Sequence, residues 1–192
     1  MEQRQKEVKL LAVYRKTGDP RAIDALVLEN GTSLFSLLVA LTRNRQDAEE
    51  IFQETWLKVM KNAGGFHGGS FKAWLTTIAR RTWIDRLRKK SPSLSLDRED
   101  ENGIPAIEKL ESNSAPHPLA FMESSEEMEA IRHAVSRLPD DQREVFLMRT
   151  MEELSFAEIA KSLSIPLNTA LGKMHYAVLK LRKELNRNEK ND

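Results

Sequence analysis

Apolar residues recur at intervals of three and four along most of the chain, which is the spacing that places them on one face of an α-helix. In the first half, this pattern predicts a short helix near the N-terminus and further helices over about 20–41, 46–62 and 70–90. In the second half, it predicts helices over about 122–137, 139–151, 155–163 and 167–187. No segment shows a convincing β-strand alternation of apolar and polar residues. We therefore expect an all-α protein.

Residue types that start and stop helices occur at the ends of these segments. Gly18-Asp19-Pro20 separates the first two helices, because glycine suits a helix end and proline suits a first helical turn. Four glycines in residues 63–69 lose too much backbone entropy to stay helical, so this segment is expected to be a loop. Ser70 then has the position of an N-cap, and Ser155 with Glu158 predicts a capping box.

Residues 91–121 interrupt the helical pattern. They contain four prolines, abundant serine, and two basic against six acidic side chains, a net charge of −4. Such a composition buries too little apolar surface to offset the entropy lost on ordering. We therefore expect two small helical domains, residues 1–90 and 122–192, joined by a flexible acidic linker over residues 91–121.

Composition excludes several classes of function. The chain has no cysteine, and its four histidines lie far apart. Disulfides, thiolate metal ligands and a cysteine nucleophile are therefore excluded, and neither a metal site nor a catalytic triad is indicated. We expect no cofactor and no enzymatic activity. There is no signal-peptide pattern and no apolar run long enough to cross a membrane, so a cytoplasmic protein without membrane insertion is expected.

Positive charge is concentrated in the first half, where residues 1–90 carry 17 basic and 10 acidic side chains. The basic residues at 80–90 are combined with Trp74 and Trp83 and, just upstream, with Phe66 and Phe71. Single-stranded nucleic acid requires this combination, because each stacked base contributes about 1–3 kcal/mol and the cations follow the phosphates. A core role accounts for Phe71 and Trp74, whereas we interpret the basic run with Trp83 as a nucleic-acid site.

The segments 155–163 and 167–187 have the spacing of a helix-turn-helix. Pro166 ends the first of these helices and starts the second. The outer side of the second helix carries donors that suit base edges and phosphates, namely Thr169, Lys173, Tyr176 and Lys180. By geometry alone, an ordinary solvated face explains them equally well. The basic C-terminal end of the helix favours DNA.

Five segments of the chain resemble extracytoplasmic-function sigma factors, a group within the sigma-70 family of RNA polymerase subunits. Residues 47–56 (DAEEIFQETW), 71–80 (FKAWLTTIAR) and 85–88 (DRLR) are similar to region 2 of that family. Residues 138–146 (LPDDQREVF) and 154–160 (LSFAEIA) are similar to region 4. The resemblance implies a region 2 helical bundle, a region 4 helix-turn-helix and a role in transcription initiation.

The resemblance also implies a role for each part. Region 2 would bind the polymerase β′ clamp through Asp47, Glu50, Gln53, Glu54 and Trp56. It would hold the opened minus-10 element through Phe66, His67, Ser70, Lys72, Arg80, Arg81, Trp83, Arg86, Arg88 and Lys89. Region 4 would bind the minus-35 element through Thr169, Leu171, Gly172, Lys173, His175, Tyr176 and Lys180. The implied partners are core RNA polymerase, through its β′ clamp and β subunits, promoter DNA in duplex and single-stranded form, and an anti-sigma factor.

Leu171 and Gly172 stand where the family commonly has a basic residue and a serine, which leaves the recognition helix with fewer DNA contacts. Two other hypotheses therefore remain open. A helix-turn-helix regulator that works without polymerase explains residues 138–190 only. A sigma-like protein that acts by sequestration, without reading a promoter, also accounts for the altered recognition helix.

Overall fold

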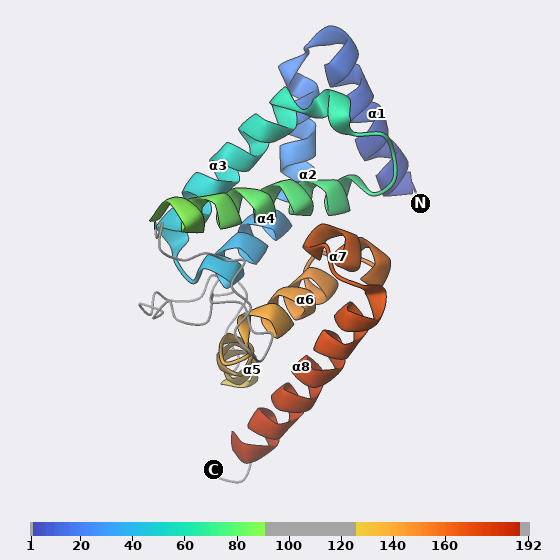
Figure 1. Ribbon diagram of the computed structural model, residues 1–192. Helices are drawn as coiled ribbons and strands as arrows, with labels where there is room; N and C mark the ends of the chain where they lie inside the picture. Colours follow the sequence, from blue (N-terminus) through green and yellow to red (C-terminus); the bar gives the residue numbers. More distant parts are fainter. Residues whose placement is uncertain (1, 91–125, 189–192) are drawn as a thin grey trace.

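The computed structural model of the protein describes residues 2–90 and 126–188, and these ranges contain helices but no strands (Figure 1). The N-terminal unit (residues 2–90) consists of α1 (Glu2–Thr17), α2 (Pro20–Thr42), α3 (Arg45–Lys61), the 3₁₀ turn η1 (Ala63–Gly65) and α4 (Phe71–Lys90). The C-terminal unit (residues 126–188) consists of α5 (Glu126–Ser136), α6 (Asp140–Thr150), α7 (Phe156–Leu163) and α8 (Leu167–Asn188). The all-α expectation is confirmed. The linker expected over residues 91–121 lies outside the described residues.

Local chemistry explains where the helices of the N-terminal unit begin. Asp19 caps α2, because its carboxylate accepts a hydrogen bond from the Arg21 amide at 3.0 Å, and Pro20 occupies the first helical position. Gly18 precedes them with φ +69°, a left-handed conformation that glycine adopts without steric cost. The Ser70 hydroxyl accepts a hydrogen bond from the backbone amide of Ala73 in α4 at 3.1 Å. The sequence therefore placed both helix starts correctly.

Ser155 and Glu158 form the expected capping box at the start of α7. The Glu158 amide donates to the Ser155 hydroxyl at 3.3 Å, and the Ser155 amide donates to the Glu158 carboxylate at 2.8 Å. Burial raises the pKa of Glu158, but the hydrogen bonds from Ser155 outweigh burial, so the net pKa is lowered. Ser164 ends α7 in the left-handed conformation, at φ 57°, and turns the chain into α8.

Helix α2 is the centre of the N-terminal unit. It packs against α1, α3 and α4, and Leu26, Leu34 and Leu38 are fully enclosed. Phe71 and Leu75 of α4 complete this core. By length and composition alone α2 would also suit a membrane, but half of its apolar stretch is buried within the protein, as in the core helix of a globular domain.

The long helix α8 lies across the other helices of the C-terminal unit (Figure 1). Ala170 and Ala177 on α8 are completely buried. Their small side chains allow the backbone of α8 to approach its neighbours closely. Helices α7 and α8 together form the helix-turn-helix that the sequence predicted.

The two units pack directly against each other. Helix α4 contacts α7, and α2 contacts α6. Leu138 and Leu147 of the C-terminal unit belong to the same buried cluster as Phe71 of the N-terminal unit. One hydrophobic core therefore extends across both units, which the sequence did not predict.

Candidate nucleic-acid and polymerase interfaces

Helix α4 carries most of the residues that were predicted to hold minus-10 DNA. Arg81, Arg88 and Lys89 are exposed, as is His67 in the loop before the helix. Four others are partly covered, namely Ser70, Lys72, Arg80 and Arg86. The predicted cations thus lie on more than one face of α4, and only some face solvent.

The two aromatic residues predicted to stack on bases lie in the core instead. Phe66 is 6% exposed, with ring centroids 5.4 Å from Trp74 and 6.1 Å from Phe71. Trp83 is 8% exposed. Burial of an aromatic ring stabilises a small domain, and both rings are part of the packed core. Little of either ring face therefore remains exposed to contact a base.

A cavity of about 330 Å³ lies beside the glycine-rich loop. Its walls come from α1 and from that loop, and they are formed by Val8, Leu11, Ala12, Arg15, Phe66, His67 and Gly68. Its lining combines apolar side chains with one cation and one imidazole, a combination that suits an unstacked base and its phosphate. No local pattern in the sequence indicates the α1 wall, because that helix lies far from the loop along the chain.

The predicted polymerase-binding surface lies on α3. Glu50 and Gln53 are exposed and Glu54 is partly exposed, so they form an accessible acidic strip with Asp47 at its partly covered end. Trp56 does not belong to this surface. It is 5% exposed and contacts Phe52 edge to face at 6.2 Å, which makes it a core residue.

Arg86 connects the two predicted sites of the N-terminal unit. Its guanidinium forms an ion pair with Glu50 and lies 3.8 Å from Glu54. A predicted DNA contact on α4 therefore neutralises two predicted polymerase contacts on α3. Lys58 adds a second link between these helices, because it lies 3.0 Å from both Glu54 and the Thr82 hydroxyl.

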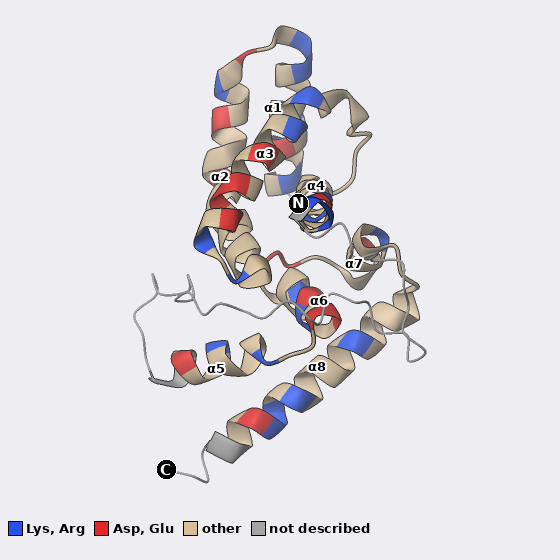
Figure 2. Ribbon diagram, turned by 60° about the vertical axis from the view of Figure 1, so that its left-hand side comes forward, with Lys and Arg blue, Asp and Glu red and all other residues tan. Residues whose placement is uncertain are grey.

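Helix α8 exposes most of the residues predicted to contact the minus-35 element. The exposed members are Thr169, Leu171, His175, Tyr176 and Lys180, whereas Gly172 and Lys173 are partly covered. Figure 2 shows basic segments spaced along α8 with an acidic one near its C-terminal end. Lys173 is paired with Asp141 of α6. The exposed face therefore combines apolar and basic groups.

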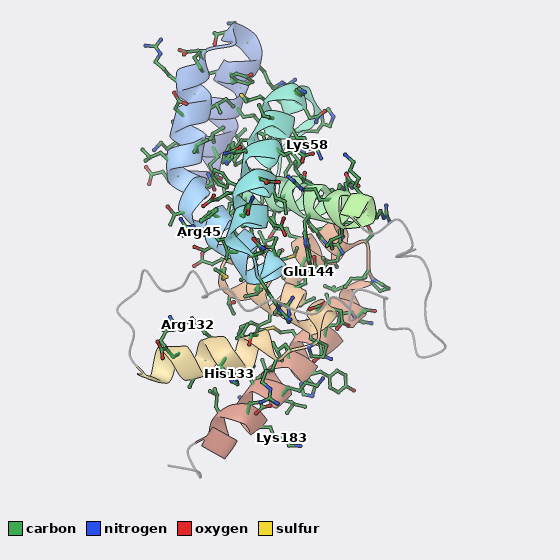
Figure 3. All side chains as sticks on the ribbon, turned by 90° about the vertical axis from the view of Figure 1, so that its left-hand side faces the viewer. Arg45, Lys58, Arg132, His133, Glu144 and Lys183 are labelled. Carbon is green, nitrogen blue, oxygen red and sulfur yellow. The ribbon has the colours of Figure 1, made fainter. Side chains whose placement is uncertain are left out.

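Two cations of α4 that were predicted to bind DNA form ion pairs with acidic side chains of the C-terminal unit. Glu152 lies with its Oε2 3.6 Å from Lys72 Nζ and accepts a hydrogen bond from Ser33 at 2.9 Å. Glu144 accepts from Arg80 and lies at the junction of the two units (Figure 3). Burial raises the pKa of both carboxyls, although the neighbouring cations partly counteract it.

No group of three or more metal-ligating side chains occurs in the part of the chain that the structure describes. A helix-turn-helix, a glycine-rich loop and a basic helix on one chain are instead typical of a DNA-binding transcription protein. The family described as sigma-70 region 2 matches residues 26–92, and the family described as sigma-70 region 4 matches residues 128–181.

Similarity to known proteins extends over most of the chain. The ECF RNA polymerase sigma factor SigW of Bacillus subtilis is 31% identical over 173 residues, which cover 88% of this chain and 92% of SigW. SigE of Mycolicibacterium smegmatis is 27% identical over 175 residues, which cover 89% of this chain and 65% of SigE. The chain belongs to the extracytoplasmic-function group of the sigma-70 family.

Two solved structures have the same fold. The structure of CnrH in complex with the cytosolic domain of CnrY has a TM-score of 0.66 at 19% sequence identity. The superposition covers 95% of this chain and 98% of the CnrH chain. The sigma factor RpoE of Bartonella quintana, in complex with the anti-sigma factor NepR, has a TM-score of 0.68 at 23% identity. That superposition covers 85% of this chain and 96% of the RpoE chain.

Proposed function

We propose that the protein is a sigma factor that binds core RNA polymerase and directs promoter recognition and opening at the start of transcription. The observation that carries this proposal is the presence of regions 2 and 4, in order, on a chain 31% identical to SigW over most of both lengths. A cytoplasmic, non-enzymatic protein fits this function. The domains proposed are residues 1–90 for region 2, residues 91–121 for the linker and residues 122–192 for region 4.

The glycine-rich loop and α4 are the proposed minus-10 site. An unpaired base of the non-template strand would enter the cavity beside the loop, with Arg15 and His67 at its wall. The exposed cations Arg81, Arg88 and Lys89 would hold the phosphates of the same strand. Phe66 and Trp83 support the site from the core and do not stack on bases.

The outer face of α8 is the proposed minus-35 site. Leu171 is 42% exposed and offers an apolar contact for a thymine methyl group, while Tyr176 and Lys180 offer donors to bases and phosphates. Because the face has few cations, we expect it to contribute less affinity than α4. A regulator that lacks polymerase contacts would leave the acidic strip of α3 without a role.

The acidic strip of α3 is the proposed docking surface for the β′ clamp. A cation there would repel a basic partner, so Gln53→Arg is expected to weaken core polymerase binding and leave DNA binding intact. Gln3→Arg, the same change at an exposed position on α1, serves as the control. An anti-sigma factor is a further proposed partner, since the RpoE structure with the same fold contains one.

The test is transcription from a library of genomic fragments with purified chain and core polymerase, followed by sequencing of the transcript 5′ ends. The proposal expects defined start sites that neither component produces alone. If Gln53→Arg initiates as well as the wild type, the α3 docking site is wrong. If no core enzyme gives a chain-dependent start site, the sigma function is wrong.

A further inference from the structure

The exposed cations of α4 lie far from the cavity beside the glycine-rich loop. Arg81, Arg88 and Lys89 are about 15–27 Å along α4 from its first residue, at 1.5 Å per residue. The loop that lines the cavity lies at the other end, just before Phe71. A base in the cavity carries a phosphate on each side, and neutralised phosphates supply much of the affinity for a strand. Binding of that base therefore calls for cations close to the loop.

Helix α1 presents cations at this position. Ala12 and Arg15 belong to the α1 wall of the cavity. Lys9 lies three residues before Ala12 and Lys16 lies four residues after it, and residues at these spacings are neighbours on a helix surface. All four side chains are exposed. On the loop side, an added Cβ at Gly68 would meet no other atom within 4 Å. Three cations of α1 therefore border the cavity where the loop leaves space.

Ion pairing separates these three cations from the others on α1. Helix α1 carries basic residues along its length (Figure 2). The two that are farther from the cavity in sequence, Arg4 and Lys6, each have an acidic partner. Within the described part of the chain, Lys9, Arg15 and Lys16 form no ion pair. An unpaired cation can bind a phosphate without first giving up a carboxylate. The available charge of α1 is thus concentrated beside the cavity.

We propose that α1 is a further DNA-binding surface of the protein: Lys9, Arg15 and Lys16 bind the phosphates of single-stranded DNA on either side of the base held in the cavity. This inference rests on the proposed function, because that function places the base in the cavity. Helix α1 precedes residues 26–92, the part of the chain that matches region 2. The inference therefore adds a DNA contact from outside the matched region.

The dimensions of α1 suit a short stretch of strand. Lys9 and Lys16 are about 10 Å apart along the helix axis, at 1.5 Å per residue. This distance corresponds to about three phosphates of a stacked strand at 3.4 Å each, and to fewer when the strand is extended. The surface therefore accommodates the phosphates that flank one captured base.

The salt dependence of binding tests the proposal. The probe is a fluorescent single-stranded DNA of mixed sequence, titrated with the full chain between about 50 and 200 mM salt. Each phosphate contact contributes about 0.7 to the slope of log affinity against log salt concentration for a single strand. We expect the slope to fall by about 0.7 in Lys9→Gln and in Lys16→Gln, and by about 1.4 in the double variant. Over this range the wild type should then lose about sevenfold more affinity than the double variant.

Lys6→Gln is the matched control, because it removes the same charge from an exposed position of the same helix, where Glu29 already pairs with it. Its slope should equal that of the wild type. Lys16→Arg keeps the charge and should also have the wild-type slope. Equal slopes in all variants would overturn the proposal, as would a fall in Lys6→Gln as large as in Lys16→Gln. A wild-type chain that fails to bind the probe at about 50 mM salt would overturn it too.

Transcription separates this proposal from the sigma function. With core polymerase, the double variant of Lys9 and Lys16 should give severalfold less transcript than Lys6→Gln at the same start sites. If the two initiate equally well and their binding slopes agree, the α1 surface is wrong and the sigma function is unaffected. If no form of the chain, including the wild type, initiates with any core enzyme, the sigma function is wrong, and the binding slopes alone decide whether α1 binds a strand.

Discussion

Individual side chains in the predicted sites divide into those that face solvent and those that build the core. Sequence similarity placed Trp56 beside Gln53 and Glu54 on one acidic segment, but the helical turn directs the indole inward. The rings of Phe66 and Trp83 are buried in the same way, although charged residues lie near them in the sequence. An aromatic residue next to charged ones satisfies both a core and a binding pattern, and only its burial distinguishes them.

Trp56 and Gln53 are expected to behave differently when truncated. Trp56→Ala should lower the free energy of unfolding by about 3–5 kcal/mol, because it removes a buried ring and leaves a cavity. Gln53→Ala should change stability by less than about 0.5 kcal/mol, because the residue is exposed. Urea denaturation measures both. Similar small losses at the two positions would contradict the core assignment of Trp56.

Glu7 predicts a dependence of stability on pH. It is 3% exposed on α1, and burial raises its pKa above the ordinary value of 4.5, with a hydrogen bond from Asn30 in partial opposition. Lys72 and Arg4 also lower this pKa, and Glu29 raises it. In the window just above 4.5 the folded state therefore holds more protons than the unfolded state, so stability falls as pH rises through that window.

The measurement for Glu7 compares the wild type with Glu7→Gln by denaturation over a series of pH values. The variant cannot titrate at this position, so its stability should change less steeply in the same window. Glu144 and Glu152 contribute in the same direction to both proteins, which is why the difference between them is the informative quantity. Parallel curves would show that Glu7 has no raised pKa.

At the scale of helices, most of the structure could be predicted from the sequence. The periodic apolar residues located all eight α-helices of the described ranges, and Asp19, Ser70 and the Ser155–Glu158 capping box fixed where three of them begin. These signals are local, because a cap or a break depends on residues within one turn. The recognition helix was also identified, including its unusual Gly172.

Two glycines provide a matched test of helix and turn. Gly172 lies inside α8 with no other atom near the position of an added Cβ, so Gly172→Ala should stabilise the protein by about 0.5–1 kcal/mol. Gly18 has φ +69°, so Gly18→Ala should be destabilising even though the space is open. Thermal denaturation compares the two. A stabilising change at Gly18 would contradict the left-handed turn.

At the scale of the whole molecule, a disulfide lock between α4 and α7, introduced by Thr77→Cys with Ser162→Cys, should change stability, because the hydroxyls of Thr77 and Ser162 are hydrogen-bonded at 3.0 Å. Cross-linking Thr77 and Ser162 closes a loop of roughly 85 residues, which by the chain-entropy model stabilises the folded state by about 4–5 kcal/mol. Denaturation of the oxidised and reduced chains measures this difference. A lock that forms only on unfolding, or that lowers stability, would show that α4 and α7 are not packed as the structure has them.

The sequence by itself determined the helices, their caps and the similarity to regions 2 and 4, because periodicity, capping chemistry and motif order are encoded along the chain. Tertiary structure alone decided that Trp56, Phe66 and Trp83 are buried, and that α1 forms a wall of the cavity beside the loop. It also decided that Glu144 pairs with Arg80 and that Glu152 pairs with Lys72. These contacts join residues distant in sequence, and a pairing of that kind leaves no periodic or local signal to detect.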